Sequence, residues 1–133
     1  MKKILFSLGV LLMTLASCTP SAIEIEPGSA AEAAQKFFTA CKDKNFEAAA
    51  EVSDLGETMG LSEETLKGLL AKSLNTAFGE MNFEEIFVTE VGEEADGVVK
   101  VKLYGTIDGD SGYLTVPVKK VGEEWKVDWQ NVE

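Results

Sequence analysis

Apolar residues recur at helical spacing in the stretch that follows residue 28. Ser29-Ala30-Ala31-Glu32 has the S-x-x-E form of a capping box, in which the first and last side chains satisfy backbone N–H groups at the start of a helix. Beyond this motif, the apolar positions on one helical face are Ala30, Ala33, Ala34, Phe37, Phe38 and Cys41. We therefore predict a first helix from Ala30 to about Lys42.

Two further helices are predicted before residue 80. Asn45 is suited to cap a short helix over residues 46–52. Ser62 is suited to cap a longer one, whose first turn carries two glutamates and which Gly79 can end. The apolar face predicted for this third helix comprises Leu66, Leu69, Leu70, Leu74, Ala77 and Phe78.

The hydrophobic period changes from 3.6 to 2 after Gly79. Residues 83–91 are apolar on both parities, as in a strand covered on both faces. Residues 99–107, 114–118 and 125–129 alternate between apolar and polar side chains, as in half-buried strands. Three helices followed by four strands indicate an α+β domain, with an antiparallel meander packed on the helices.

The segments between the strands are short enough for hairpin turns. They cover residues 92–97, 108–112 and 122–124, and each contains glycine. Pro117 lies inside the third strand and predicts a bulge or a local break in pairing there. The acidic loop "DGDSG" (108–112) begins like a calcium-binding EF-hand loop, but Tyr113 and Lys119 stand where that loop needs glycine and glutamate, so a turn is favoured over a metal site.

Residues 1–17 have the layout of a secretory signal peptide, with a basic start and a short apolar run. Leu15-Ala16-Ser17-Cys18 resembles the lipobox of bacterial lipoproteins, which implies lipidation of Cys18 and cleavage just before it. Plain secretion is the alternative. If Cys18 is lipidated, residues 18–28 would serve as a tether, and residues 29–133 would form one domain. In a Gram-negative cell, Thr19 after the cysteine would favour the outer membrane.

Composition excludes more chemistry than any motif suggests. A chain cut before Cys18 would keep ten basic and 23 acidic side chains, a net charge of −13, which repels nucleic acid and anionic lipid. The sequence has no arginine and no histidine, so the commonest phosphate clamp and the commonest general base are missing. Without a histidine partner, Cys41 is expected to be a buried core thiol rather than a nucleophile. We expect no metal and no cofactor.

The order of elements resembles the nuclear-transport-factor-2-like, or cystatin-like, fold. The likeness spans about residues 29–130 and rests on "AAQKFFTACKDKNFEAAAEV" (33–52) and "VPVKKVGEEWKVDW" (116–129). Within this fold, the chain is similar to small bacterial lipoproteins that carry a lumazine-binding-like or uncharacterised domain. The resemblance implies three N-terminal helices packed on a bent four-stranded antiparallel sheet.

Enzymes of this fold place an acid or base, often with a tyrosine, in a cone between sheet and helices. The nearest candidates in this chain are Tyr104 and Asp108, whose strand parity is opposite to the apolar face, so they are expected to point outward. No catalytic residue is therefore assigned. The aromatic and apolar side chains expected around the cone are Phe37, Phe38, Phe78, Leu103, Trp125 and Trp129, either as pocket lining or as plain core.

Three functions remain open from the sequence. The first is a membrane-anchored, non-enzymatic binding module that takes a small apolar ligand in the cone or a partner protein on the outer sheet face. The second is a structural or accessory envelope protein without a pocket. The third is an isomerase-like or dehydratase-like enzyme, which would require a carboxyl group isolated in an apolar pocket.

Overall fold

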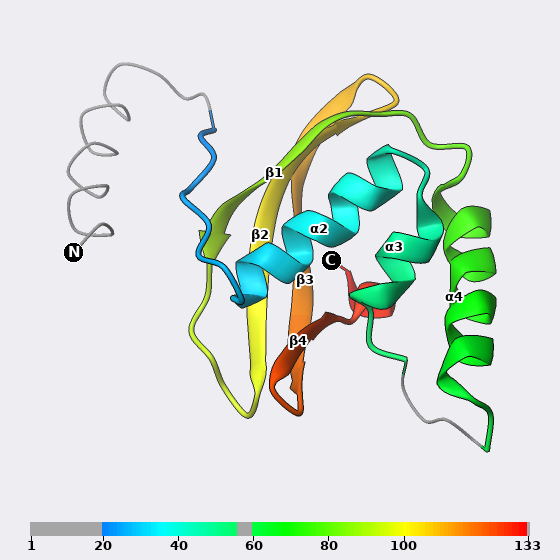
Figure 1. Cartoon of the computed structure of the whole chain (residues 1–133). Coiled ribbons are helices and arrows are strands. Elements are labelled where there is room, and N and C mark those ends of the chain that lie inside the picture. Colours follow the sequence, from blue (N-terminus) through cyan, green and yellow to red (C-terminus); the bar gives the residue numbers. More distant parts are fainter. Residues whose placement is uncertain (1–19, 56–59, 133) are drawn as a thin grey trace.

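The computed structural model describes residues 20–55 and 60–132. The signal peptide and Cys18 lie outside these residues. Three α-helices are followed by a four-stranded antiparallel sheet and a short 3-10 helix, which confirms the predicted α+β class (Figure 1). The helices are α2 (Ala30–Lys42), α3 (Phe46–Glu51) and α4 (Glu63–Phe78). The remaining elements are β1 (Phe83–Val91), β2 (Val98–Ile107), β3 (Asp110–Val121), β4 (Glu124–Val127) and η1 (Trp129–Asn131).

Each helix begins at the residue that the sequence indicates. The Ser29 hydroxyl accepts from the backbone N–H of Glu32 at 3.3 Å, whereas the Glu32 carboxylate accepts from the N–H of Gly28, one residue earlier than in a standard capping box. The Asn45 side chain accepts from the N–H of Ala48 at the start of α3. The Ser62 hydroxyl accepts from the N–H of Thr65 at the start of α4. Local capping therefore fixes all three N-termini.

α4 is only partly covered by the rest of the domain. Of its predicted apolar face, Leu74 alone is fully buried, and Leu69 is 51% exposed. The helix packs on α3 and stands away from the sheet (Figure 1). The six-residue helix α3 can cover only a narrow stripe of α4. The buried face of α4 is therefore narrower than the predicted apolar face.

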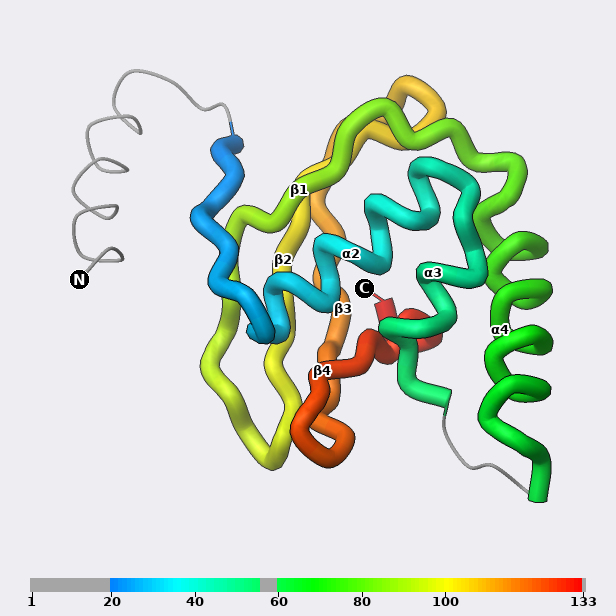
Figure 2. Tube along the Cα trace, in the orientation of Figure 1, coloured from blue at the N-terminus to red at the C-terminus, as the bar shows by residue number. Residues whose placement is uncertain are grey.

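The sheet runs β1-β2-β3-β4, and each strand pairs antiparallel with the next. Asp96-Gly97 and Asp108-Gly109 are two-residue loops in which both residues have positive φ, as type I′ hairpin turns require. The turn expected over residues 108–112 is thus shorter than predicted, and β3 already begins at Asp110. The sheet bends around α2, which lies across its inner face (Figure 2).

One expectation about the strands is wrong, and another is confirmed only toward β4. β1 is an edge strand rather than one covered on both faces, and register shifts near Glu84 and Thr89 let apolar residues of both parities reach the core. Pro117 causes no shift in the pairing of β2 with β3. Its ring nitrogen faces β4 instead, since its carbonyl accepts from the N–H of Asp128, and with no N–H to donate it ends that ladder.

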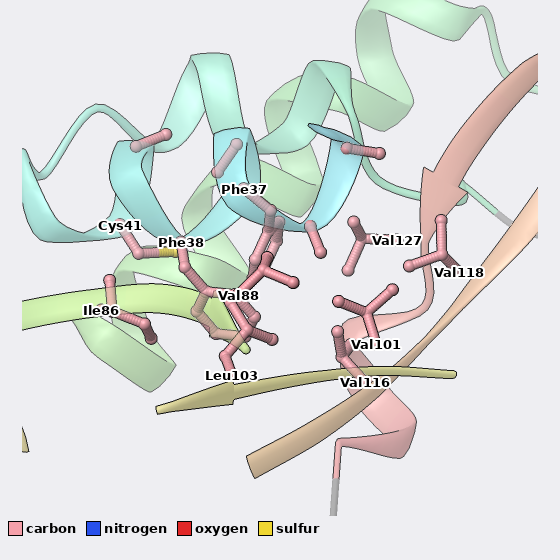
Figure 3. Close-up of a cluster of buried hydrophobic side chains, with 14 of the residues drawn as sticks. Phe37, Phe38, Cys41, Ile86, Val88, Val101, Leu103, Val116, Val118 and Val127 are labelled. Carbon is pink, nitrogen blue, oxygen red and sulfur yellow. The ribbon is translucent and has the colours of Figure 1, made fainter. Parts of the chain in front are cut away.

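The core fills the space between α2 and the inner face of the sheet (Figure 3). Phe37 and Phe38 project from α2 with their rings edge to face at 4.9 Å. Every second side chain of the strands points from the sheet toward these two rings. The fully buried apolar members on the strands are Val88, Val101, Leu103, Val116, Val118 and Val127. At about 25 cal/mol per Å² of apolar surface, this burial is the main stabilising term of the domain.

Both edges of the sheet are closed. Along β4, the backbone of Val127 exchanges hydrogen bonds with Val52 and Asp54, the residues that follow α3. Along β1 lies the N-terminal strap, residues 20–28, which contains no helix or strand and ends in a turn at Pro27 and Gly28; the N–H of Ile23 in it donates to the carbonyl of Val88 at 3.1 Å. The stretch expected to act as a tether therefore contacts the domain from Ile23 onward.

Candidate functional site

Three aromatic rings form a row across the outer face of the sheet, on the side away from α2. Phe87, Tyr104 and Tyr113 occupy paired positions on β1, β2 and β3. The ring centroids of Phe87 and Tyr104 are 5.8 Å apart, and those of Tyr104 and Tyr113 are 5.2 Å apart. Phe87 and Tyr104 are half-buried and Tyr113 is 53% exposed, so the row presents an open aromatic surface.

Lysines and hydroxyl groups surround this aromatic row. The Nζ atom of Lys102 lies 4.6 Å from the centre of the Tyr113 ring, within the range of a cation–π contact. Lys100 is exposed one position further along the same face. At the other end of the row, the hydroxyls of Thr106 and Ser111 share a hydrogen bond of 2.8 Å. Glu90 of β1 is exposed and paired with Lys102, so the face combines apolar, hydroxyl, cationic and anionic groups.

This arrangement suits recognition rather than bond making. Tyrosine offers a large amphipathic surface at low cost in conformational entropy and is enriched in protein interfaces. The Tyr104–Tyr113 pair is inclined by 69°, so the rings do not form the flat platform on which a sugar ring stacks. Cross-strand aromatic pairs also stabilise the sheet itself, by about 0.2–1 kcal/mol each.

The six side chains expected around the cone divide into three groups. Phe37, Phe38 and Leu103 are at most 1% exposed and belong to the core. Phe78 and Trp129 are partly buried and meet at 5.9 Å between ring centroids, where η1 packs against the end of α4. Trp125 is partly buried on β4, with the Nζ atom of Lys120 5.6 Å from its ring centre.

A groove of about 980 Å³ lies between α3 and α4, and none of those six residues lines it. Phe46 and Ala71 contribute apolar surface to the groove, whereas Gly68 contributes no side chain to its α4 wall. The charged residues on its walls are Lys44, Glu47, Glu51, Glu64, Lys67 and Lys72. Gly68 is one of the lining residues, and a Cβ built there would meet no atom within 4 Å.

Few of the described residues are suited to catalysis or to metal binding. Within residues 20–55 and 60–132, no three metal-binding side chains come together, and every Asp and Glu has some solvent exposure. The Cys41 thiol is buried, and this burial raises its pKa to about 12, so the thiolate is disfavoured at neutral pH. None of the described helices has the length and apolar character needed to cross a membrane.

The sequence placed Tyr104 on the outer face, and the structure confirms its position there beside Tyr113. A turn over residues 108–112 does not predict that these two rings pair, because it leaves the start of β3 and hence the register undefined. A two-residue Asp108-Gly109 turn, which is the strongest short hairpin signal, sets Tyr104 opposite Tyr113 in register. Phe87 could not be assigned in the same way, because a bulge separates it from the nearest turn.

No protein-family model matches the chain, and no curated protein matches it. Several solved structures do match the chain. A SEC-C motif containing protein from Rhodopseudomonas palustris is 18% identical with a TM-score of 0.55, covering 79% of this chain and 80% of that one. A DUF4783 family protein from Bacteroides ovatus ATCC 8483 is 14% identical with a TM-score of 0.50, covering 79% and 90%.

A ketosteroid isomerase-like protein from Erwinia carotovora atroseptica SCRI1043 is 17% identical, with a TM-score of 0.51 and coverage of 78% of this chain and 92% of that one. Similarities at these identities show the fold alone. They agree with the nuclear-transport-factor-2-like α+β architecture that the sequence resemblance implied. Activity has to be argued from the chain's own residues.

Proposed function

We propose that this protein is a non-enzymatic lipoprotein of the bacterial cell envelope, anchored through Cys18, which binds a partner protein on the outer face of its sheet. The lipobox-like sequence Leu15-Ala16-Ser17-Cys18 supports the anchor. In a cell with two membranes, Thr19 favours the outer one. The aromatic row of Phe87, Tyr104 and Tyr113 supports the binding surface.

The observation that carries the proposal is the exposure of Tyr113. A tyrosine that is 53% exposed, backed by two further rings and approached by Lys102, has the features of an interface anchor. The charges around it indicate the partner. Lys100 and Lys102 of β2 and Glu90 of β1, which is paired with Lys102, lie on this face, so we expect a partner surface that is apolar at its centre and carries charges of both signs at its rim.

Two alternatives, an isomerase-like enzyme and a binding module for a small apolar ligand, have less support. An isomerase-like site needs a carboxyl group in an apolar pocket, and no Asp or Glu among the described residues is buried. A small apolar ligand needs space near the cone residues, of which Phe37, Phe38 and Leu103 are packed in the core. We therefore place the binding function on the outer sheet face.

The test uses a photo-crosslinking amino acid at Tyr113 in the full lipoprotein, expressed in its own host. Val121 is the matched control, since it is 49% exposed and lies at the far end of β3. We expect a discrete adduct from position 113 and none from position 121. With the purified partner, Tyr113→Ser should weaken binding by roughly 30-fold, the effect of losing about 2 kcal/mol, while Val121→Ser leaves affinity unchanged.

Two results would reject the surface. Equal crosslinking from both positions would show chance encounters, and a Tyr113→Ser variant with full affinity would place the interface elsewhere. An adduct with a second copy of the chain would assign the face to self-association and contradict the proposed partner.

The anchor is tested separately by mass spectrometry of the mature N-terminus. We expect an acylated cysteine at position 18 in the wild type, and a Cys18→Ser variant that is not acylated and leaves the membrane fraction. An unmodified N-terminus in the wild type would indicate plain secretion.

A further inference from the structure

The N-terminal strap is fixed to the edge of β1 before α2 begins. The N–H of Ile23 donates to the carbonyl of Val88 at 3.1 Å, and Ile23 and Ile25 are half-buried against the core. Further along, the carbonyl of Glu26 accepts from both the hydroxyl and the N–H of Ser29, at 2.6 and 3.3 Å. The chain therefore leaves the domain surface at Ile23, beside β1.

Little chain remains between that point and the lipid. Five residue steps separate Cys18 from Ile23, and a fully extended chain of that length reaches at most about 18 Å. A domain of roughly 110 residues has a radius of gyration of about 13 Å, which corresponds to a diameter of about 34 Å. The strap and α4 lie on opposite sides of the molecule (Figures 1 and 2).

We infer that the strap orients the domain at the membrane, with the β1 edge toward the bilayer and α4, with its groove, away from it. The inference rests on the proposed acylation of Cys18. If α4 faced the bilayer, Ile23 would lie about 30 Å from the lipid surface, which is beyond the reach of the intervening chain. The docked strap thus acts as a short mount rather than as a free tether.

The orientation decides which surfaces a partner can approach. The groove is bordered by α4, and α4 lies on the side of the molecule away from the strap (Figure 1). The acidic surface of the domain is repelled by anionic lipid, which also opposes close contact between bilayer and domain.

The experiment places a fluorophore on single introduced cysteines in the full, lipidated protein, bound to vesicles that carry a nitroxide on the lipid headgroup. Glu90→Cys labels the end of β1 and Lys72→Cys labels α4, and both original side chains are exposed. Cys41 is buried and is replaced by alanine in both variants. We expect quenching at position 90 to exceed that at position 72 by at least about twofold, because the mount limits the reach of the chain.

A second variant carries a twelve-residue Gly-Ser insertion between Pro20 and Ser21. The insertion leaves the Ile23 contact intact but lengthens the reach by about 40 Å, so the two labels should then be quenched alike. Equal quenching at positions 72 and 90 without the insertion would overturn the orientation while the acylated anchor stands. Absence of lipid on wild-type Cys18 would overturn the anchor, and the inferred orientation with it.

Discussion

The side-chain amide of Gln35 on α2 completes the hydrogen bonding of Val88 at the edge of the sheet. Its Oε1 atom accepts from the N–H of Val88 at 3.1 Å, and its Nε2 atom donates to the carbonyl of Ile86 at 3.1 Å. Together with Ile23, which donates to the carbonyl of Val88, this amide occupies backbone groups that an edge strand otherwise offers to another chain.

Removal of this amide should destabilise the domain. Gln35→Ala leaves two partly buried backbone groups of β1 without their partner, and we expect a loss of about 1–3 kcal/mol in the free energy of unfolding, measured by urea titration. Lys36→Ala is the matched control. Lys36 is exposed and, among the described residues, forms an ion pair with Glu32 one turn away, so its loss should cost less than about 0.5 kcal/mol. Equal losses in the two variants would contradict a specific role for the amide.

Two leucines on α4 should respond differently to the same substitution. Leu74 is fully buried against the domain, and Leu74→Ala is expected to lower the free energy of unfolding by about 2–5 kcal/mol. Leu69 is 51% exposed, and Leu69→Ala should change the free energy of unfolding by less than about 0.5 kcal/mol. Urea unfolding followed by circular dichroism measures both. A large loss from Leu69→Ala would show that α4 turns another face toward α3.

The buried thiol of Cys41 should make stability fall at high pH. Burial raises its pKa from 9.0 in the unfolded chain to about 12 in the folded state. Between these values only the unfolded state loses the proton, so the stabilising difference is complete below pH 9 and declines as the pH rises toward 12. We expect the urea midpoint to drop more between pH 8 and pH 10 in the parent chain than in Cys41→Ala. Parallel drops in the two proteins would contradict the shift.

Thiol reactivity gives an independent measure of the same burial. In a Cys18→Ser chain, Cys41 is the remaining thiol. It should react with a disulfide reagent at pH 8 only after urea has unfolded the protein. Prompt reaction in the folded state would show that the thiol is accessible.

Lys119 connects the segment after α3 to the end of β4. Its Nζ atom lies 3.4 Å from a carboxylate oxygen of Asp128 and 3.4 Å from one of Asp54. The hydrogen bond and charge of Asp128, followed by the charge of Asp54, raise the pKa of Lys119 above its ordinary value of 10.5. A raised lysine pKa stabilises the fold below the unfolded value, and the contribution is lost as the pH rises through the folded value.

The expected size of this contribution is small because the Lys119 side chain is 42% exposed to solvent. Lys119→Met should cost no more than about 1 kcal/mol of unfolding free energy at low salt, and less at 1 M NaCl, where ion pairs are screened. Lys72→Met, on the exposed side of α4, is the control and should show no such salt dependence. An effect of Lys119→Met that persists at 1 M NaCl would argue for packing of the lysine stem rather than for charge.

The helices and strands could be predicted because their signals are local. Ser29, Asn45 and Ser62 each bond a backbone N–H within three residues, so the sequence suffices to place the helix starts. The extent of β4 could not be predicted in the same way. Its ladder ends where Pro117, ten residues earlier in the chain, offers no N–H, and Trp129 then leaves the strand for η1.

The candidate site could be predicted only in part, for a related reason. Alternation along β2 is enough to turn Tyr104 outward, but the row that it forms with Phe87 and Tyr113 depends on pairing between strands. The burial of Leu74 and the exposure of Leu69 likewise depend on how much of α4 the short helix α3 covers. Both leucines belong to the same predicted apolar face, so their periodicity alone does not separate them.

By itself the sequence determined the α+β class, the start of each helix, the segments that contain the turns and the outward parity of Tyr104, because capping, periodicity and turn chemistry act within a few residues. The lipobox-like motif at Cys18 belongs to the sequence alone, since it lies outside the described residues. Only the tertiary structure decided the aromatic row, the docking of Ile23 and Gln35 on β1, and the groove beside Gly68. These features arise where segments far apart in the chain pack together, and such packing is set by the surfaces that the whole fold leaves available.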